Sequence, residues 1–387
     1  MNRDGAISRR DFLKLSAAGL IGLLGPGLHL DTSTALSAST STDPSLRSLA
    51  CRPGQAGLRL SASLAQAAAT RQGRVAYNSV SVYDAPSKSG NRVSTFRRDS
   101  VLEISEQVTG GKLEDYNRAW YRIGEQGYVY SGGIQPVETR LNEVVTDLPE
   151  AGAVGEITIP YSESWWGINR TPFPGARLYY ATAHWIKDIA VDKRDGSLWY
   201  RAYDHLYSAY YYIRPYNVRI LPAEELTPLS PDVPPEDKYI EVRLDEQTVI
   251  AYEGERQVFR ARASTGKAEF GTPTGWFKTF HKRPTAHMVG GESEAALYDL
   301  TGVPWDGYIT ENGVAFHGTF WHNDYGTPHS HGCINLSPPA AKWLYRWTLP
   351  AVPPDQRYVY EPGAGTNVQV IEHTHQRRPN EPRFFMV

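Results

Sequence analysis

Short runs rich in β-branched and aromatic residues, separated by turn residues, recur in the first part of the chain. They fall at 75–77, 79–83, 101–105, 119–123 and 127–130. Runs of this composition between turn residues predict short strands, and five of them at this spacing favour a small barrel over residues 74–137. Aromatic residues make up 12% of the chain, with 34 Gly and 27 Pro, and this mixture favours short strands and turns over long helices. We therefore expect a mainly β protein.

A weaker copy of this pattern follows at residues 156–221. Leu198-Trp199-Tyr200-Arg201 is similar to Ala119-Trp120-Tyr121-Arg122, and Tyr211-Tyr212-Ile213 is similar to Tyr128-Val129-Tyr130. Repetition of this kind predicts a second candidate barrel at 156–221.

Two segments have the composition of connections. Residues 39–73 begin with a Ser/Thr-rich stretch, which is typical of a flexible tether. Residues 222–237 contain five prolines, which remove backbone donors and predict a stiff linker. After it, apolar runs at 239–244, 248–252, 257–263 and 276–280 predict an all-β or nearly all-β domain at 238–375, with a short helix at 339–349.

The N-terminus has the order of a signal peptide, which is basic, then apolar, then polar. Arg9 and Arg10 form a twin-arginine pair, and an uncharged run of 14 residues follows at 15–28. Because about 20 apolar residues are needed to span a bilayer, this run is too short for a transmembrane helix. We expect residues 1–38 to direct export by the twin-arginine route to the cell wall or a periplasm-like space, with no transmembrane segment in the mature chain. A basic, disordered N-terminus of a cytosolic protein is the alternative.

The chain has only two cysteines, Cys51 and Cys333, which are too few for a disulfide framework. A single bridge between them is one alternative. Lipidation of Cys51 is another, because Ser48-Leu49-Ala50-Cys51 resembles a lipoprotein box. The formal net charge of −2 gives no argument for binding nucleic acid.

The surroundings of Cys333 favour a chemical role. A cysteine attacks carbonyl groups as the thiolate, and because a free thiol has a pKa of about 8.5, a neighbouring imidazole must take its proton. His317 suits that role, since a strand over 314–319 would place His317 on the face opposite Phe316. In an extended stretch, His331 and Cys333 would share a face.

Gly332 removes a side chain beside the sulfur of Cys333. This leaves room for a substrate and lets backbone N–H groups near Cys333 form an oxyanion hole. Ser330 and Asn335 can bond to the backbone and hold the loop.

The pattern His317-Gly318, a gap, and then Ser330-His331-Gly332-Cys333-Ile334-Asn335 resembles the catalytic domain of the L,D-transpeptidases, the YkuD type. The upstream run 271–275 and the hairpin of 239–266 are similar to the same family. The segment 74–137 resembles the bacterial SH3 family. The expected architecture is mainly β, with one or two small SH3-like barrels followed by a β-rich YkuD-type domain.

The resemblance implies a role for each residue of this pattern. Cys333 would be the nucleophile and His317 the general base, oriented by the backbone carbonyl of Gly318. His331 would support the site, and the amides of Gly332 and Cys333 would bind the oxyanion. Many relatives have serine where this chain has Gly318. The candidate substrate-binding residues are Tyr308, Trp321, His322, Ser330 and Asn335.

By resemblance, the reaction joins stem peptides of peptidoglycan in 3→3 cross-links and releases D-Ala. Water as the acceptor would make the protein an L,D-carboxypeptidase. No cofactor and no metal are implied. The expected partners are stem peptides and, through the SH3-like modules, glycan strands.

Two other readings stay open. The first is a zinc site, because five potential ligands lie close together in sequence: His317, His322, His329, His331 and Cys333. Their spacing fits no common zinc motif. The second is a wall-binding protein whose catalytic domain is inactive.

Overall fold

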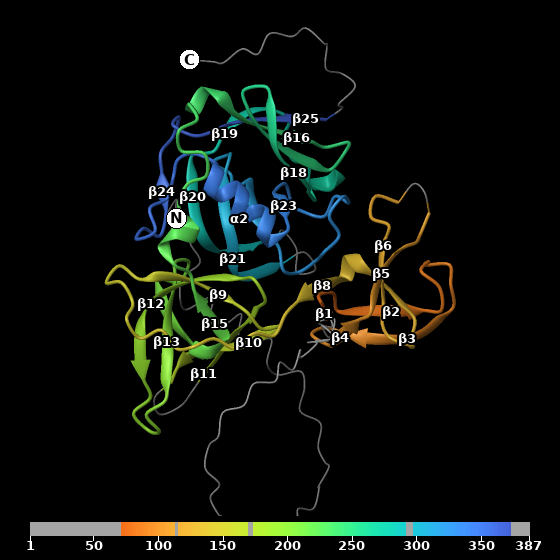
Figure 1. Ribbon diagram of the computed structural model, residues 1–387, viewed down its shortest axis with the longest axis horizontal. Coiled ribbons are helices and arrows are strands. Elements are labelled where there is room, and N and C mark those ends of the chain that lie inside the picture. Colours follow the sequence, from red (N-terminus) through yellow and green to blue (C-terminus); the bar gives the residue numbers. More distant parts are fainter. Residues whose placement is uncertain (1–70, 113–114, 169–172, 292–296, 373–387) are drawn as a thin grey trace, which may run out of the picture. The chain divides into compact units, whose positions relative to one another are not determined.

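The computed structural model describes residues 71–112, 115–168, 173–291 and 297–372. The chain is mainly β in these ranges, as the sequence predicted (Figure 1). The predicted export signal, Cys51 and nearly all of the predicted tether lie outside the described residues. No helix within the described ranges has both the length and the apolar character that crossing a membrane requires.

Residues 71–137, here called the N-terminal module, form two antiparallel sheets around one apolar core. The strand orders are β4-β1-β8 and β3-β2-β7-β6-β5. The core contains Val75, Val82, Ile104, Val129 and Ile134. The elements are β1 (Arg71–Val75), β2 (Ser79–Tyr83), β3 (Arg92–Arg97), β4 (Val101–Ile104), β5 (Glu106–Thr109), β6 (Ala119–Arg122), β7 (Tyr128–Tyr130), the 3-10 helix η1 (Ser131–Gly133) and β8 (Ile134–Val137).

The sequence predicted β2, β4, β6 and β7 to within one residue, but it placed the first strand wrongly. That strand covers 71–75 rather than 75–77. Its sequence, Arg-Gln-Gly-Arg-Val, lacks the alternating apolar residues that mark a strand. Gly73 instead packs its backbone directly against Ile134 and Ile104. A Cβ on Gly73 would lie 2.4 Å from Ile134, so close approach of the backbone takes the place of an apolar side chain.

Residues 153–220, here called the middle module, form one antiparallel sheet of seven strands in the order β11-β10-β14-β13-β12-β9-β15. Its core includes Ile157, Leu178, Ile186, Tyr200 and Ile213. The predicted strands at 198–201 and 211–213 are parts of β13 and β14. The elements are β9 (Ala153–Ile157), β10 (Tyr161–Gly167), β11 (Phe173–Tyr179), β12 (Ala183–Val191), β13 (Leu198–Asp204), β14 (Ala209–Ile213), η2 (Pro215–Asn217) and β15 (Val218–Ile220).

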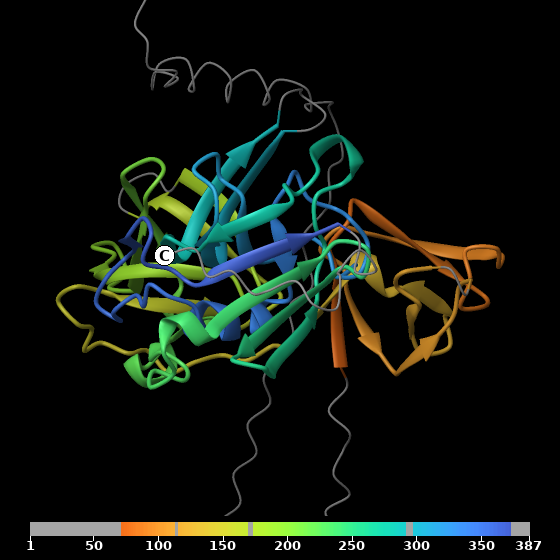
Figure 2. The same ribbon diagram turned by 90° about the horizontal axis from the view of Figure 1, so that it is seen from above.

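Residues 238–371, here called the C-terminal domain, contain two five-stranded sheets. The first has the order β18-β17-β16-β25-β19, in which β25 pairs in parallel with β16 (Figure 2). Its strands are β16 (Lys238–Arg243), β17 (Thr248–Glu253), β18 (Arg256–Arg262), β19 (Gly275–Lys278) and β25 (Asn367–Ile371), and η5 (Ala268–Phe270) precedes β19. The second has the order β23-β22-β21-β20-β24, built from β20 (His281–Gly290), β21 (Tyr298–Tyr308), β22 (Ala315–Gly318), β23 (Ile334–Leu336) and β24 (Val359–Tyr360).

One α-helix, α2 (Pro338–Trp347), is present in the described ranges and packs on β21 and β22 (Figure 1). Two prolines fit its first turn, where the N–H groups have no partner within the helix. Ala341, Leu344 and Tyr345 recur at helical spacing and are buried in the domain core. The sequence predicted this helix at 339–349, close to its observed position.

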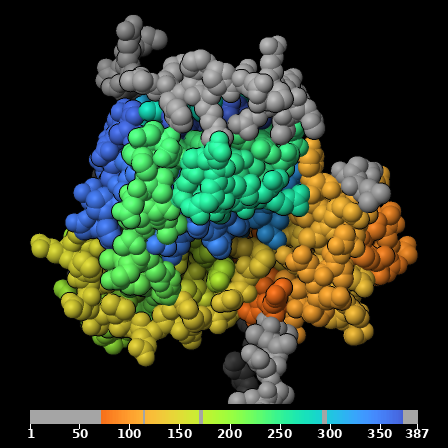
Figure 3. Space-filling model, turned by 45° about the horizontal axis from the view of Figure 1, so that its top comes forward, coloured from red at the N-terminus to blue at the C-terminus, as the bar shows by residue number. Residues whose placement is uncertain are grey.

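The proline-rich segment 221–238 is packed rather than free. Leu221 and Leu226 are buried in the same core as the C-terminal domain, and the Leu229 N–H donates to the Arg346 carbonyl at 3.0 Å. The segment includes η3 (Ala223–Leu226) and η4 (Pro235–Asp237), and Figure 3 shows it in green on the surface of the C-terminal domain.

The middle module and the C-terminal domain share a core. Val154, Ala183 and Trp185 of the middle module belong to the apolar cluster that contains the C-terminal sheets and α2. The sequence suggested two bodies joined by a spacer, but proline only removes backbone donors and does not stop apolar side chains from packing.

Candidate functional site

The predicted chemical residues lie on or directly before two neighbouring parallel strands. His317 is on β22, and Cys333 immediately precedes β23. Phe316 pairs with Ile334 and both are buried, so Cys333 lies one position before this pair, next to Ala315. His317 is on the face of β22 opposite Phe316, as its place in the sequence predicted. The sheet thereby brings the thiol and the imidazole to one face.

The tautomer of His317 is fixed by its own strand. Its Nδ1 lies 3.1 Å from the Gly318 carbonyl oxygen, and because a carbonyl only accepts, Nδ1 carries the proton. The lone pair therefore resides on Nε2, which has no hydrogen-bond partner among the described residues. Burial lowers the pKa of His317 to about 4, although the bond to Gly318 acts in the opposite direction. His317 is therefore a neutral base at neutral pH.

The Cys333 thiol is partly exposed, and its Sγ lies 3.5 Å from the Gly313 carbonyl, to which the S–H donates. Burial by its neighbours raises the pKa of Cys333 to about 11, partly offset by a hydrogen bond with the Ala315 backbone. With its pKa above that of His317, the thiol keeps its proton at rest. No hydrogen bond joins Sγ to the imidazole in the described part of the chain. Such contacts are often long in ligand-free enzymes and tighten when a substrate binds.

The turn before Cys333 is held by Ser330. The Ser330 Oγ donates to the Cys333 carbonyl at 2.5 Å and accepts the Gly332 N–H at 3.1 Å. Gly332 has a φ of 113°, a conformation that favours glycine. The prediction that 331–333 is one extended stretch is therefore wrong, because Gly332 turns the chain and β23 begins only at Ile334.

The Gly332 amide is already engaged in this state. Since its N–H donates to Ser330, it would have to leave that hydroxyl to bind an oxyanion. The Gly332 carbonyl is also held, by the Thr272 hydroxyl at 2.8 Å. Thr272 belongs to the 271–275 run, so this run helps to hold the turn that precedes Cys333.

The other predicted site residues divide into surface and interior groups. His331 is exposed, with its ring 4.5 Å from that of Phe270. Tyr308 and Trp321 are partly exposed. Tyr308 stacks on His281 at 4.8 Å, and the Trp321 ring lies 5.6 Å from that of His317. These two aromatic side chains border the face that carries His317.

His322, Ser330 and Asn335 are interior residues, with exposures of 2%, 7% and 1%. The Asp324 N–H donates to His322 Nδ1, and the Asn335 amide faces His322 Nε2 at 3.0 Å. Asn335 is paired with His317 across β22 and β23 and so shares its face, but all three side chains are covered by the protein and their contacts are internal.

Sequence reasoning missed Asp306 and Arg283. They are paired across β20 and β21, two register positions from the pair formed by His281 and Tyr308. Both carboxyl oxygens of Asp306 are buried without a hydrogen-bond partner in the described structure, as is Arg283 Nε. Burial raises the pKa of Asp306 well above its ordinary value. The available signal was spacing, since Asp306 is two residues before the candidate Tyr308 and so shares its face.

When ionised, the Asp306 carboxylate raises the pKa of Cys333, although burial of the thiol is the larger cause. We expect Asp306→Asn to lower the Cys333 pKa from about 11 while keeping it above that of a free thiol. The rate of Cys333 alkylation by iodoacetamide, measured against pH, gives this value. An unchanged or higher pKa would show that the carboxyl does not act on the thiol. Asp299→Asn, on an exposed part of β21, is the control.

The five potential zinc ligands do not converge. His322 and His329 stack face to face at 4.7 Å, and His331 packs on Phe270. Within the described ranges, no group of three or more His, Cys, Asp or Glu side chains is arranged to hold a metal ion.

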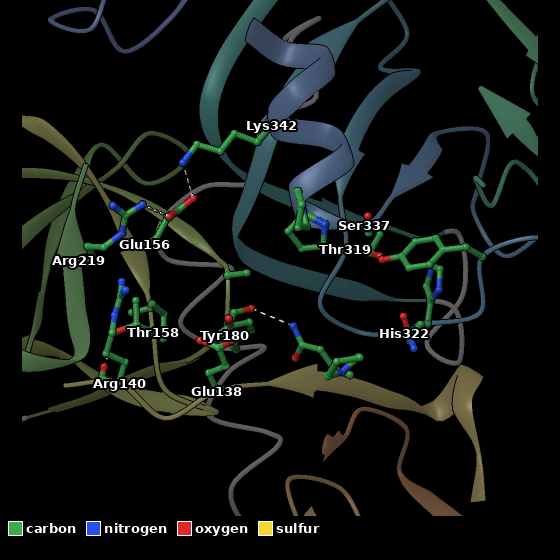
Figure 4. A pocket seen from close by; sticks show the side chains of 18 residues that line it. Glu138, Arg140, Glu156, Thr158, Tyr180, Arg219, Thr319, His322, Ser337 and Lys342 are labelled. Carbon is green, nitrogen blue, oxygen red and sulfur yellow. Dashed lines mark hydrogen bonds and ion pairs between the residues drawn. The ribbon is translucent and has the colours of Figure 1, made fainter. Parts of the chain in front are cut away.

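A cavity of about 620 Å³ is lined in part by the segment that connects His317 to Cys333. Thr319, His322 and Ser337 line it from the C-terminal domain, and Arg140, Glu156, Tyr180 and Arg219 line it from the preceding part of the chain (Figure 4). Lys342 and Glu156 form an ion pair across it at 3.3 Å. Neither His317 nor Cys333 lines this cavity, so we treat it as separate from the reacting face.

Residues 237–370 match the family model of the L,D-transpeptidase catalytic domain, YkuD. A curated protein of Bacillus subtilis (strain 168), YciB, whose name provisionally calls it an L,D-transpeptidase, is 28% identical over 128 residues, covering 30% of this chain and 63% of that protein. The family resemblance found in the sequence is therefore supported for the C-terminal domain.

Solved structures with similarity include an L,D-transpeptidase from Mycobacterium smegmatis, at 29% identity, covering 35% of this chain and 58% of that chain, with a TM-score of 0.29. The catalytic domain of an E. faecium L,D-transpeptidase is 28% identical, with 35% of this chain and 98% of that chain covered and a TM-score of 0.29. This chain spans less than two thirds of the curated relative and of the mycobacterial protein.

Proposed function

We propose that this protein is an exported L,D-transpeptidase that forms 3→3 cross-links between peptidoglycan stem peptides through a thioester on Cys333. The observation that carries the proposal is the pairing of His317 Nδ1–H with the Gly318 carbonyl. It leaves Nε2 with a lone pair on the same sheet face as a partly exposed thiol, within a domain that matches this family.

In the first half-reaction, His317 Nε2 takes the proton of the Cys333 thiol. The thiolate attacks the carbonyl at the L-centre of the third residue of a donor tetrapeptide. The bond to the terminal D-Ala breaks, and the D-Ala nitrogen takes the proton back from His317. The products are a thioester and free D-Ala, and His317 is again neutral.

In the second half-reaction, an amine of an acceptor stem attacks the thioester carbonyl. His317 accepts a proton from that amine, the C–S bond breaks, and the proton returns to sulfur. If water is the attacking group, the same cysteine gives L,D-carboxypeptidase activity. A partly exposed thiol beside a free imidazole nitrogen supports an enzyme over an inactive wall-binding protein.

Two further parts of the proposal concern regions outside this site. Export by the twin-arginine route would place the domain where peptidoglycan occurs. Glycan strands would bind to the SH3-like modules, where aromatic side chains such as Phe173 and Tyr216 are exposed at 62% and 44%.

Incubation with a defined disaccharide-tetrapeptide tests the reaction directly. We expect mass spectrometry to detect release of D-Ala and a cross-linked dimer. A product in which D-Ala has been replaced by water would establish hydrolysis instead. Absence of both products in folded protein would contradict the proposal.

By resemblance to the family, a carbapenem should acylate Cys333. We expect intact-mass spectrometry to show one adduct on the wild-type chain and none on Cys333→Ala. Peptide mapping should place the adduct on the peptide that contains residue 333. An adduct that persists in Cys333→Ala would assign the reaction to another side chain.

A further inference from the structure

We propose that Tyr130 and Asn117 of the N-terminal module are positioning residues for the chemistry at Cys333. They act through Asp324 in the 319–332 loop, which connects His317 to Cys333. This inference rests on the proposed function for the identity of the substrate. The contacts of Asp324 from which it is argued do not depend on that function.

Asp324 is a buried carboxylate that receives bonds from both parts of the chain. The Tyr130 hydroxyl and the Asn117 amide donate to Oδ1 at 2.5 and 3.0 Å, and a ring nitrogen of His329 lies 2.9 Å from Oδ2. Burial alone would raise the pKa of Asp324, but hydrogen bonds from His329, Tyr130 and Asn117 outweigh it and lower the pKa to about 2. Asp324 is therefore ionised, and two of these donors come from the N-terminal module.

The N-terminal module also holds the loop on both sides of Trp321. Before it, Arg74 donates to the Phe320 carbonyl at 2.5 Å. After it, the Asn323 N–H donates to the Gly132 carbonyl at 2.8 Å. Trp321 lies between these fixed points and packs beside the His317 ring. Because both neighbours of Trp321 are held, the position of the Trp321 ring beside His317 is held as well.

A second path leads from Asp324 to the nucleophile. His329, which is bonded to Asp324, stacks on His322, and His322 faces the Asn335 amide at 3.0 Å. Ser330 follows His329 in the chain and holds the Cys333 carbonyl. Figure 4 shows His322, which belongs to the same loop, at the wall of the cavity. The position of Cys333 is thus connected to Tyr130 by a chain of direct contacts.

A purely structural contact would have a different signature. It would lower thermal stability and leave kcat unchanged in the protein that stays folded. A positioning role lowers kcat, or the reactivity of the thiol, at unchanged KM and little change in Tm, because small displacements of reacting groups reduce rate steeply.

Tyr130→Phe is the sharpest variant. It removes only the hydroxyl, and the ring can still pack edge-on against Trp120 at 5.6 Å. We expect kcat for the tetrapeptide to fall about tenfold or more with KM little changed. Tyr128→Phe is the matched control on the same strand, because the Tyr128 hydroxyl makes no hydrogen bond among the described residues, and it should behave as wild type.

A double-mutant cycle with Asp324→Asn tests the route of action. If Tyr130 acts through Asp324, the double variant should be no slower than Asp324→Asn alone, because removing a bond already lost has no further effect. Additive losses would overturn the route. Wild-type kcat in Tyr130→Phe would overturn the proposal itself.

A second measurement separates this inference from the proposed function. The rate of Cys333 alkylation by iodoacetamide needs no peptide substrate. If the wild-type chain fails to turn over the tetrapeptide, the proposed function fails, and alkylation still reports on positioning. A rate of Cys333 alkylation in Tyr130→Phe that differs from the rate in Tyr128→Phe supports the inference, whereas equal rates contradict it.

Discussion

Cys333→Ala should abolish both D-Ala release and cross-link formation, reducing turnover below detection. No other group in the proposed mechanism can form the acyl-enzyme. The fold should persist, since the change removes a single sulfur from a partly exposed position. Product analysis by mass spectrometry and a thermal melt together measure the two effects.

The chain supplies its own matched control for this variant. Cys51 is the only other cysteine, so Cys51→Ala tests whether loss of any thiol affects the reaction. We expect Cys51→Ala to keep wild-type turnover in the purified protein. Turnover that survives in Cys333→Ala, or is lost in Cys51→Ala, would assign the nucleophile elsewhere.

His317→Ala should lower kcat by roughly 10²–10⁴-fold, the usual contribution of a general base. In the wild-type protein the pKa of His317 is about 4, so the base is already neutral from mildly acidic pH upward. Without it, the thiolate must form by loss of the proton to solvent. Because the pKa of Cys333 is about 11, the residual rate of the variant should rise with pH throughout the neutral and alkaline range.

The pH profile distinguishes loss of a base from loss of structure. A variant that is merely misfolded would be slow at every pH and would melt early. A residual rate that does not rise with pH, in a protein with wild-type Tm, would assign proton transfer to another group. His331→Ala is the comparison, because that exposed ring has no bond to the thiol in the described structure, and its loss should cost far less.

The strands that carry the chemistry could be predicted because their alternation is simple. Phe316 is buried and His317 faces the other way, so one strand orients the imidazole without information from the rest of the fold. The strand β2 was equally clear, with Val80 and Val82 buried and its other residues facing outward or partly covered.

The long strands β20 and β21 gave no such signal. Lys282 is buried in β20, where its amino group donates to the Tyr345 and Thr348 carbonyls, each at 2.6 Å. Asp306 is buried in β21, and Pro284 and Pro304 lie within the two strands. Charged residues at interior positions and prolines within strands both count against a strand in a sequence. The partners that satisfy Lys282 come from a distant segment, which a local pattern does not show.

The contacts of Asp324 were beyond sequence reasoning for a different reason. Its partners Asn117 and Tyr130 are 207 and 194 residues away, and no local pattern connects them. Tyr130 looked like an ordinary residue of a short strand. Only the folded chain shows that its hydroxyl reaches the loop beside the nucleophile.

The parallel pairing of β25 with β16 affects how this domain is made during synthesis. Residues 367–371 lie between β16 and β19, so these two strands cannot join in one sheet until residues 367–371 have been synthesised. Until then β16 and β19 each present an unpaired edge, which is open to association with other chains. Translation that stops before residue 367 would therefore yield an aggregating product rather than a shortened enzyme.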